Sequence, residues 1–174
     1  MNNKQVTTLL LAKENHYLVQ QQLLKQYQQP IITINLNIPG VNKQEKIYQK
    51  FFSKVKNDFL VFLKLNRINY QFLKEINDVA GSFLIIVLQK EVNCLNFKKQ
   101  LIEEELKNPS YQLVDIDLYD EKNHKISRSE LNYPLKKCYL CSNSAKLCAR
   151  TKNHPLDLLL LYINKVIIQI FDIK

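Results

Sequence analysis

Two aspartates one residue apart, Asp115 and Asp117, stand in the apolar stretch from Leu113 to Tyr119. Side chains two residues apart on a strand point to the same face, so these carboxylates are expected about 7 Å apart. Like charges at this spacing repel each other unless a cation lies between them. Mg²⁺ binds through one or two carboxylates plus substrate phosphates, and it neutralises charge in phosphoryl or nucleotidyl transfer. The pair therefore predicts a Mg²⁺ site, with a solvated strand edge as the alternative.

Ser127 and Arg128 follow the aspartates after a polar turn. Lysine supplies most of the 25 lysine and arginine side chains, so an arginine here suggests a need for its planar fork. We expect Arg128 to return to the face of the Asp pair and bind a phosphate in a bidentate manner. The alternative is a surface ion pair with Asp120 or Glu130. For Ser127, capping of the turn is favoured over donation to a phosphate oxygen.

Cysteines are concentrated in the segment 134–154. Cys138 and Cys141 have zinc-knuckle spacing, and Cys148 and His154 follow them. Three sulfurs and one imidazole are the ligand set of a tetrahedral structural zinc site. Cys148 and His154 are further apart than in common fingers, which leaves two alternatives: small thiols packing the last helix, or a redox-active or catalytic cysteine.

The length of 174 residues fits a single domain, 1–174, that includes the segment 134–154 and a final helix at 155–172. An apolar content of 46% indicates a folded globule. The net charge of +9 suggests an anionic partner. No dense basic run is present, so nucleic acid is not expected. With only Gly40 and Gly81, a glycine-rich phosphate loop is excluded.

No signal peptide and no membrane span are expected, because the apolar C-terminal run is interrupted by polar residues. The protein is therefore expected to be cytoplasmic, with reduced thiols or a metal site in place of disulfides. Periodicity predicts α/β (or α+β) architecture, a single mixed β-sheet flanked by helices. The expected helices are 5–28, 43–66, 93–107 and 155–172, and the expected strands are 31–38, 68–76, 83–88, 113–119 and 125–127.

The order and spacing of these motifs resemble the citrate lyase holo-acyl-carrier-protein synthase family, also called apo-citrate lyase phosphoribosyl-dephospho-CoA transferase. That family carries an acidic helix end, a proline, Asp-Ile-Asp, Ser-Arg, a Cys-x-x-Cys pair, Cys-Ala-Arg and a histidine. The matching positions are Glu103, Glu105, Pro109, Asp115, Asp117, Ser127, Arg128, Cys138, Cys141, Cys148, Ala149, Arg150 and His154. Upstream, Gln20, the strand 31–38 and Pro39-Gly40 are in register, so the resemblance spans most of the chain.

The resemblance implies an enzyme with a nucleotidyltransferase-like active strand. It would move the phosphoribosyl-dephospho-CoA group from triphosphoribosyl-dephospho-CoA to a serine of the citrate lyase acyl carrier protein subunit, releasing pyrophosphate. The catalytic residues it implies are Asp115, Asp117 and Arg128. The substrate-binding residues it implies are Lys13, His16, Gln20, Ser127, Lys136, Lys137 and Arg150. A basic chain suits an acidic carrier protein as its partner.

The chain also departs from the family pattern. An arginine-rich motif near the start is represented by Lys13, His16 and Val19, and a Gly-Arg pair before the aspartates is represented by Tyr111 and Gln112. Two alternatives to the enzyme stay open, and the departures favour the first of them. One is a degenerate member that has lost turnover. The other is a non-catalytic, zinc-stabilised module that binds an acidic protein or RNA.

Overall fold

The computed structural model describes residues 3–172, which divide into two compact units. The first comprises residues 3–37 and Val41–Ile126, and the second comprises Ile38–Gly40 and residues 127–172. A single domain over 1–174 stays a prediction.

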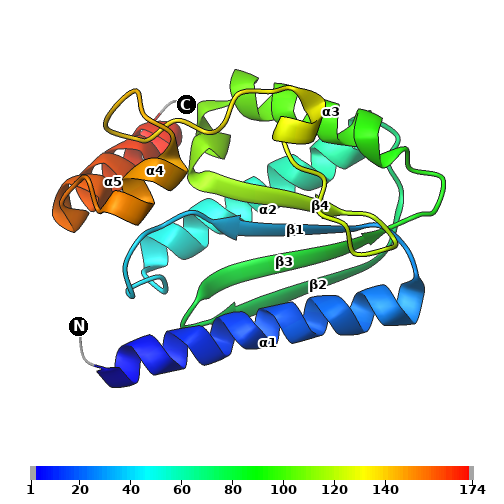
Figure 1. The fold of residues 1–174 in the computed structure, drawn as a ribbon, viewed down its shortest axis with the longest axis horizontal. Helices are drawn as coiled ribbons and strands as arrows, with labels where there is room; N and C mark the ends of the chain where they lie inside the picture. Colours follow the sequence, from blue (N-terminus) through cyan, green and yellow to red (C-terminus); the bar gives the residue numbers. More distant parts are fainter. Residues whose placement is uncertain (1–2, 173–174) are drawn as a thin grey trace. The chain divides into compact units, whose positions relative to one another are not determined.

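The first unit holds a four-stranded sheet with the order β2-β3-β1-β4 (Figure 1). All its strand pairs are antiparallel. Its elements in chain order are α1 (Asn3–Tyr27), β1 (Ile31–Leu36), α2 (Lys46–Leu65), β2 (Tyr70–Asp78), β3 (Gly81–Leu88), α3 (Cys94–Lys107), the 3-10 helix η1 (Pro109–Leu113) and β4 (Val114–Tyr119). The predicted α/β class is confirmed.

The antiparallel pairing corrects the expectation of a mixed sheet. Helix α2 connects β1 to β2 and helix α3 connects β3 to β4, connections that favour parallel neighbours. However, β3 lies between β1 and β2, and β1 lies between β3 and β4, so neither connected pair is adjacent. From β1 to β4 the chain therefore forms a split βαβ arrangement of the ferredoxin-like kind, preceded by the additional helix α1.

Helix α1 packs on one face of this sheet. Leu23 and Leu24 form a buried cluster with Ile31 of β1 and with Phe83, Ile85 and Val87 of β3. Strand alternation and pairing register place Thr33 and Asn35 of β1, and Asp115 and Asp117 of β4, on this same face. The face that α1 partly covers is thus the one that carries the candidate Mg²⁺ ligands.

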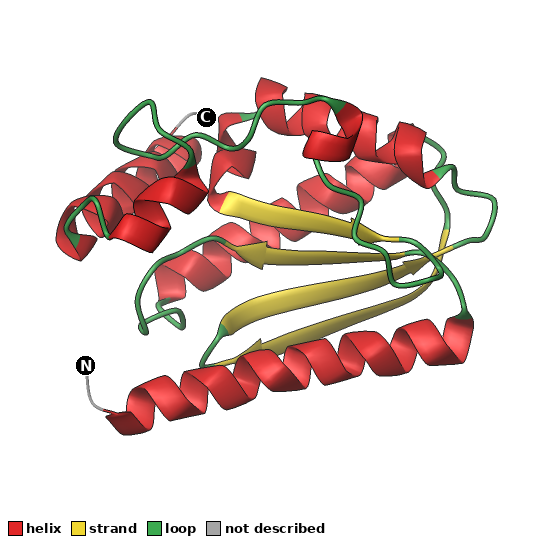
Figure 2. Cartoon of the chain, viewed as in Figure 1, coloured by secondary structure: helices red, strands yellow, loops and turns green. Residues whose placement is uncertain are grey.

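The opposite face is covered by α2 and α3 (Figure 2). Helix α2 forms because its apolar residues recur at helical spacing, and it buries Tyr48, Phe51, Phe52, Val55, Phe59 and Leu63. Asn93 caps the start of helix α3, because its side chain accepts a hydrogen bond from the Asn96 N–H. Phe97 of α3 stacks with Phe62 of α2. These helices bury one side of β4 and leave Asp115 and Asp117 on the other.

The second unit contains the 3-10 helix η2 (Ser129–Leu131), α4 (Ala145–Thr151) and α5 (Leu156–Asp172). Helix α5 buries Ile163 and Ile167, and its Tyr162 stacks on Tyr139 with ring centroids 5.7 Å apart. The expected strand 125–127 is reduced to an isolated bridge between Lys125 and Tyr119, within the first unit. Within residues 3–172, no helix combines the length and apolar character needed to span a membrane.

Candidate functional site

The two aspartates lie on one face of β4, as strand alternation requires. Burial alternates along this strand, with Val114, Ile116 and Leu118 buried and the residues between them partly exposed. Across the strand pair, Asp115 lies opposite Asn35 and Asp117 lies opposite Thr33. This pairing brings the carboxylates of Asp115 and Asp117 together with the amide of Asn35 and the hydroxyl of Thr33. All four side chains carry oxygen atoms, the ligand type that Mg²⁺ prefers.

Lys125 is bound to this acidic surface. Its Nζ lies 2.6 Å from Oδ2 of Asp117, and the bridge to Tyr119 holds its backbone beside β4. Partial burial lowers the pKa of Lys125, but the hydrogen bond and charge of Asp117 outweigh it and raise that pKa above its usual value. No sequence motif predicted a role for this lysine, although it stands three residues before Arg128.

Helix α1 contributes His16 and Gln20, which are both buried. His16 Nε2 lies 2.9 Å from Oδ2 of Asp78, and its ring stacks on Phe83 with centroids 4.3 Å apart. The side chain of Gln20 lies near that of Tyr119, two residues beyond Asp117, and lowers the Tyr119 pKa, although burial and the charge of Asp117 raise that pKa overall. Because positions 16 and 20 are one helical turn apart, both side chains face the sheet on the side of the Asp pair.

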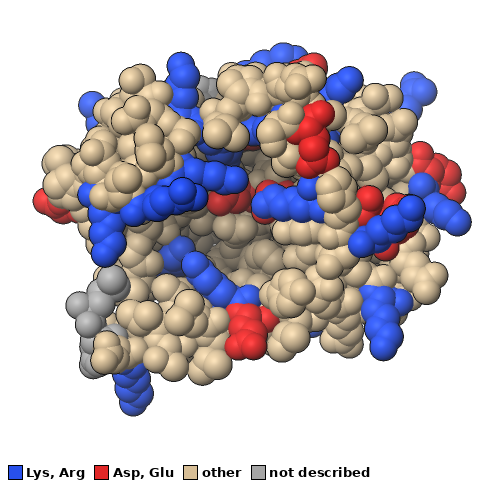
Figure 3. Space-filling model, in the orientation of Figure 1, with Lys and Arg blue, Asp and Glu red and all other residues tan. Residues whose placement is uncertain are grey.

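Lys43 and Lys13 are further charged residues that interact electrostatically near the Asp pair. The charge of Lys43 interacts with those of both Lys13 and Asp115. Burial and Lys13 lower the pKa of Lys43, and Asp115 opposes them. In Figure 3, Lys and Arg side chains are dispersed over the visible face with Asp and Glu among them.

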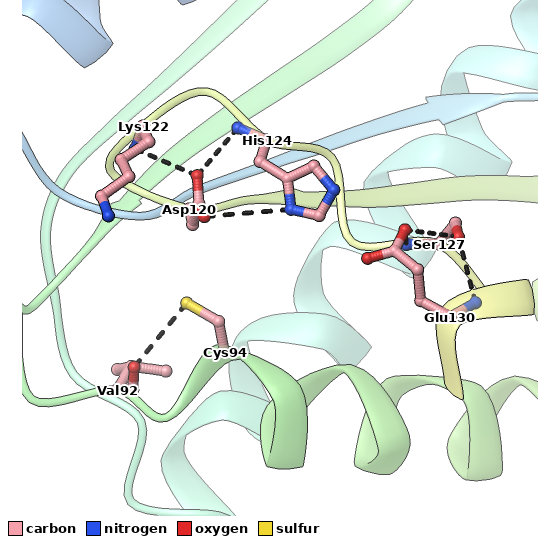
Figure 4. Close-up of polar contacts among 7 residues, drawn as sticks. All are labelled: Val92, Cys94, Asp120, Lys122, His124, Ser127 and Glu130. Atoms are coloured by element: carbon pink, nitrogen blue, oxygen red, sulfur yellow. Dashed lines mark hydrogen bonds and ion pairs between the residues drawn. The ribbon is translucent and has the colours of Figure 1, made fainter. Parts of the chain in front are cut away.

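Ser127 and Arg128 lie in the second unit. The Ser127 hydroxyl donates to Oε1 of Glu130 at 2.6 Å, and the Glu130 N–H donates back to the hydroxyl, so Ser127 caps this turn (Figure 4). Arg128 Nη1 donates to the Pro134 carbonyl oxygen at 3.4 Å. Figure 4 also shows Asp120, in the turn after β4 of the first unit, accepting bonds from the backbone of Lys122 and His124.

The remaining predicted substrate-binding residues surround α4 in sequence. The Lys136 carbonyl accepts the Ala145 N–H at 2.8 Å, and Lys137 pairs with Ser144 in an isolated bridge. Arg150 is exposed in the last turn of α4. This helix was not predicted, although Ser144 is its sequence signal because the Ser144 side chain accepts from the Leu147 N–H.

The second unit brings Cys138, Cys141, Cys148 and His154 together, and this cluster could hold a metal ion. Their ligand atoms all lie within 4.8 Å of one another. Cys141 Sγ is 3.4 Å from Cys148 Sγ and 3.3 Å from His154 Nε2. We refer to these four residues as the Cys₃His cluster. The convergence expected from the sequence spacing is observed.

The local fold explains this convergence. The Cys138 N–H donates to the Asn143 carbonyl at 2.8 Å, which closes a tight loop around Cys141. Burial raises the pKa of Cys138, but the backbone N–H groups of Leu140 and Cys141 donate to its sulfur and contribute to a net lowering. The Asn153 amide donates to Cys148 Sγ at 3.8 Å and lowers the pKa of this thiol, but burial and the neighbouring Cys141 and Cys138 raise that pKa to about 11 overall. N–H donors that point at sulfurs stabilise thiolates, the form in which cysteine binds metals.

Comparison with known proteins agrees with the sequence motifs. Residues 4–170 match the model of the family described as apo-citrate lyase phosphoribosyl-dephospho-CoA transferase. Because the match covers nearly the whole chain, the protein belongs to this family.

Three curated relatives illustrate the range of similarity. A Streptococcus pyogenes protein named probable apo-citrate lyase phosphoribosyl-dephospho-CoA transferase is 28% identical over 97% of this chain and 88% of its own length. A Vibrio cholerae protein of the same name is 26% identical over 91% and 88%. Protein CitXG of Haemophilus influenzae is 28% identical over 86% of this chain, which spans only 32% of that relative.

Two of the departures from the family pattern are explained by packing. Val19 of α1 packs against the cluster of Leu23, Leu24 and the sheet. Tyr111 is buried in η1, and burial raises the pKa of its hydroxyl well above the usual value. Both positions now contribute to the core. Gln112 is exposed, and its replacement of arginine has no structural explanation.

Proposed function

We propose that this chain transfers the phosphoribosyl-dephospho-CoA group from triphosphoribosyl-dephospho-CoA to a serine of the citrate lyase acyl carrier protein subunit, with release of pyrophosphate. The observation that carries the proposal is the face of β4. A member of this family presents Asp115 and Asp117 there together, with Lys125 beside them and Lys43 in electrostatic contact.

The reaction class is nucleotidyltransferase-type: a seryl oxygen attacks a phosphorus and pyrophosphate leaves. Asp115 and Asp117 would hold Mg²⁺, whose oxygen-ligand preference their surroundings satisfy. When bound, the ion supplies charge neutralisation on the transferred and leaving groups. Lys125, Lys13 and Lys43 of the first unit provide ammonium donors for phosphate oxygens.

The residues of the second unit are assigned to substrate contacts. Arg128 binds a phosphate through its guanidinium, and Lys136, Lys137 and Arg150 attract the acidic carrier protein. Ser127 holds the turn of Arg128 through its bonds with Glu130. His16 and Gln20 of the first unit are assigned to substrate binding on the face of the Asp pair, where His16 stacks on Phe83 and Gln20 lies near Tyr119.

Zinc is the metal proposed for the Cys₃His cluster. Three sulfurs and one imidazole nitrogen match a closed structural site, and all four positions are supplied by protein, which leaves none for a substrate. Zinc there would hold the loop of Cys138 and Cys141 against α4 and the residues that follow it. Its role would be folding of the second unit, separate from the Asp pair.

A single assay tests the proposed transfer. The purified chain is incubated with triphosphoribosyl-dephospho-CoA, Mg²⁺ and the apo carrier subunit. The mass of the carrier is then determined by mass spectrometry, and the released pyrophosphate is quantified. A mass gain of one phosphoribosyl-dephospho-CoA group, equimolar with pyrophosphate, is expected. A carrier whose acceptor serine is replaced by alanine should gain nothing. Carrier binding without any mass gain would identify a degenerate, docking-only member instead.

A further inference from the structure

Lys98 of helix α3 is a buried lysine to which the proposed transfer reaction gives no role. It is only 6% exposed, and its Nζ donates to the backbone carbonyl of Ile116 at 2.9 Å. Ile116 is the residue between Asp115 and Asp117 on β4. A lysine is almost never this buried unless its ammonium is paired, because taking an unpaired charge out of water is costly. The Lys98 side chain is therefore tied to the strand that carries the Asp pair.

The Ile116 carbonyl lies on the outer edge of β4. This strand is the last in the order β2-β3-β1-β4, so one of its edges faces away from the sheet. The Asn37 N–H donates to the Leu113 carbonyl across the β1–β4 register, which marks a hydrogen-bonded pair. Such pairs alternate along an antiparallel ladder with residues whose backbone groups point outward, and Ile116 is at an outward position. Lys98 supplies the donor that this buried edge carbonyl requires.

The bond reaches the strand from the side opposite the two carboxylates. Alternation and register put Asp115 and Asp117 on the face that α1 partly covers, whereas α3 covers the other face. Lys98 therefore holds the peptide group between Ile116 and Asp117 by its oxygen without occupying the substrate face. Groups that bind one ion together must be held to within about 0.5 Å of the productive geometry. An edge strand that lost this bond could shift by more than that.

We propose that Lys98 is a positioning residue for the Asp pair: its bond to the Ile116 carbonyl fixes the edge of β4, so that Asp115 and Asp117 can hold one divalent cation. The inference rests on the proposed function and deepens it, because it adds a residue on which the metal site depends. Lys98 acts through the backbone of β4. Lys125 differs, because its ammonium bonds the Asp117 carboxylate itself.

Calorimetric titration of the full chain with Mn²⁺, in the absence of substrate, tests the inference. Binding that disappears in Asp117→Asn identifies the Asp pair. Lys98→Met keeps the length of the side chain but loses the donor, so Mn²⁺ should bind at that site about tenfold more weakly. The sign of the change is decisive, because loss of a nearby positive charge alone would strengthen the binding of a cation.

Lys99→Met is the matched control. It removes the same charge from the next residue of α3, which is exposed, and should leave the Kd for Mn²⁺ unchanged. Unchanged or tighter binding by Lys98→Met overturns the assignment, as does a wild-type chain that binds no Mn²⁺ at the Asp pair.

A second variant covers the case in which Lys98→Met does not fold. Lys98→Gln keeps a polar end but is too short to replace the ammonium, so it should weaken Mn²⁺ binding in the same way. Circular dichroism and urea titration establish whether each variant is folded. If both variants lose their structure, or become less stable with unchanged Mn²⁺ affinity, Lys98 serves stability alone and the inference is wrong.

Transfer assays separate this inference from the proposed function. A chain whose Mn²⁺ affinity depends on Lys98 but that never modifies the carrier protein refutes the transferase alone. A Lys98→Met variant with wild-type Mn²⁺ affinity and wild-type turnover refutes the positioning role alone. Where both hold, Lys98→Met should lower kcat about tenfold while leaving the KM for the carrier protein near its wild-type value.

Discussion

Lys125 Nζ lies 2.6 Å from Asp117 Oδ2, so a protein cation stands beside one of the two carboxylates proposed to hold Mg²⁺. An ammonium and a divalent ion compete for the same carboxylate oxygen, because each requires its negative charge. If the Asp pair holds Mg²⁺ as proposed, the lysine should therefore weaken metal binding by the substrate-free protein. When substrate is present, the same ammonium can turn to a phosphate oxygen.

Replacement of Lys125 by methionine separates these two effects. Lys125→Met should strengthen Mn²⁺ or Mg²⁺ binding, measured by calorimetry without substrate, and should lower the rate of group transfer about tenfold or more. Lys122→Met, in the same turn, is the matched control and should change neither quantity. Weaker metal binding in Lys125→Met would show that the lysine supports the ion site.

The Asp117–Lys125 pair should add little to stability. Both side chains are partly exposed, so we expect Lys125→Met to lower the free energy of unfolding by at most about 1 kcal/mol in urea titrations. The pKa of Lys125 is raised in the folded state. Its contribution is therefore complete below the unfolded-state pKa of 10.5 and is lost as pH rises through the higher folded-state value.

The aspartates should be required jointly for transfer. Asp115→Asn and Asp117→Asn should each reduce turnover by at least about a hundredfold while the protein stays folded, because each removes one ionic ligand and relieves like-charge repulsion. Asp58→Asn, on the surface of α2, is the control for loss of one carboxylate. Near-normal turnover by Asp117→Asn would refute the metal assignment, whereas an unfolded variant would show up in circular dichroism.

Sequence periodicity was sufficient for the strongly patterned elements. Helix α2 and the buried strand β3 were predicted within a few residues, because their apolar spacing has one interpretation. Strand pairing was different: the order β2-β3-β1-β4 depends on which strand inserts between two others, and no local pattern encodes that. The expectation of a mixed sheet was wrong for this reason.

Some features of the candidate site could likewise be predicted from the sequence, whereas others depend on tertiary contacts. Asp115 and Asp117 could be placed on one face from their spacing alone, and the Cys₃His cluster could be proposed from its ligand types. Lys43 and Asp78 were missed because their roles arise from tertiary contacts with Asp115 and His16. Asn35 could have been predicted as a site residue from the sequence. It lies two positions after Thr33 in an otherwise apolar strand, and two polar residues at this spacing share one face of the strand.

His16 is expected to matter through both its ring and its nitrogen. His16→Phe keeps an aromatic ring against Phe83 but loses the bond to Asp78, so it should retain most of the free energy of unfolding. His16→Ala should cost about 2–4 kcal/mol, because it also leaves a cavity under α1. If turnover by His16→Phe equals that of wild type, the histidine is structural and has no polar role in substrate binding.

The Cys₃His cluster should bind one zinc ion per chain. Elemental analysis by mass spectrometry should find close to one zinc ion per chain in wild-type protein and little zinc in the Cys148→Ser or His154→Ala variants. Cys94→Ser is the matched control, because Cys94 lies in the first unit and outside the cluster. Chelation should lower the melting temperature of wild type and of Cys94→Ser, but not of Cys148→Ser. Stoichiometric zinc in Cys148→Ser would refute the assignment, and a Cys141–Cys148 disulfide in place of metal would be visible by thiol titration.

Arg128 is proposed to contact a phosphate directly, whereas Lys136 and Lys137 are proposed to attract the carrier protein over a longer range, and salt should separate these two roles. Exposed charges act mainly on the rate of encounter and are screened over about 8 Å at physiological salt. The double variant Lys136→Glu with Lys137→Glu should therefore slow transfer to the carrier protein strongly at low salt and weakly at high salt. Arg128→Lys should reduce turnover at every salt concentration, because it loses a bidentate contact with phosphate. Lys152→Glu, at the end of α4, controls for a change of surface charge alone. Equal salt dependence for the Arg128 and double-lysine variants would show that contact and long-range attraction have been assigned to the wrong residues.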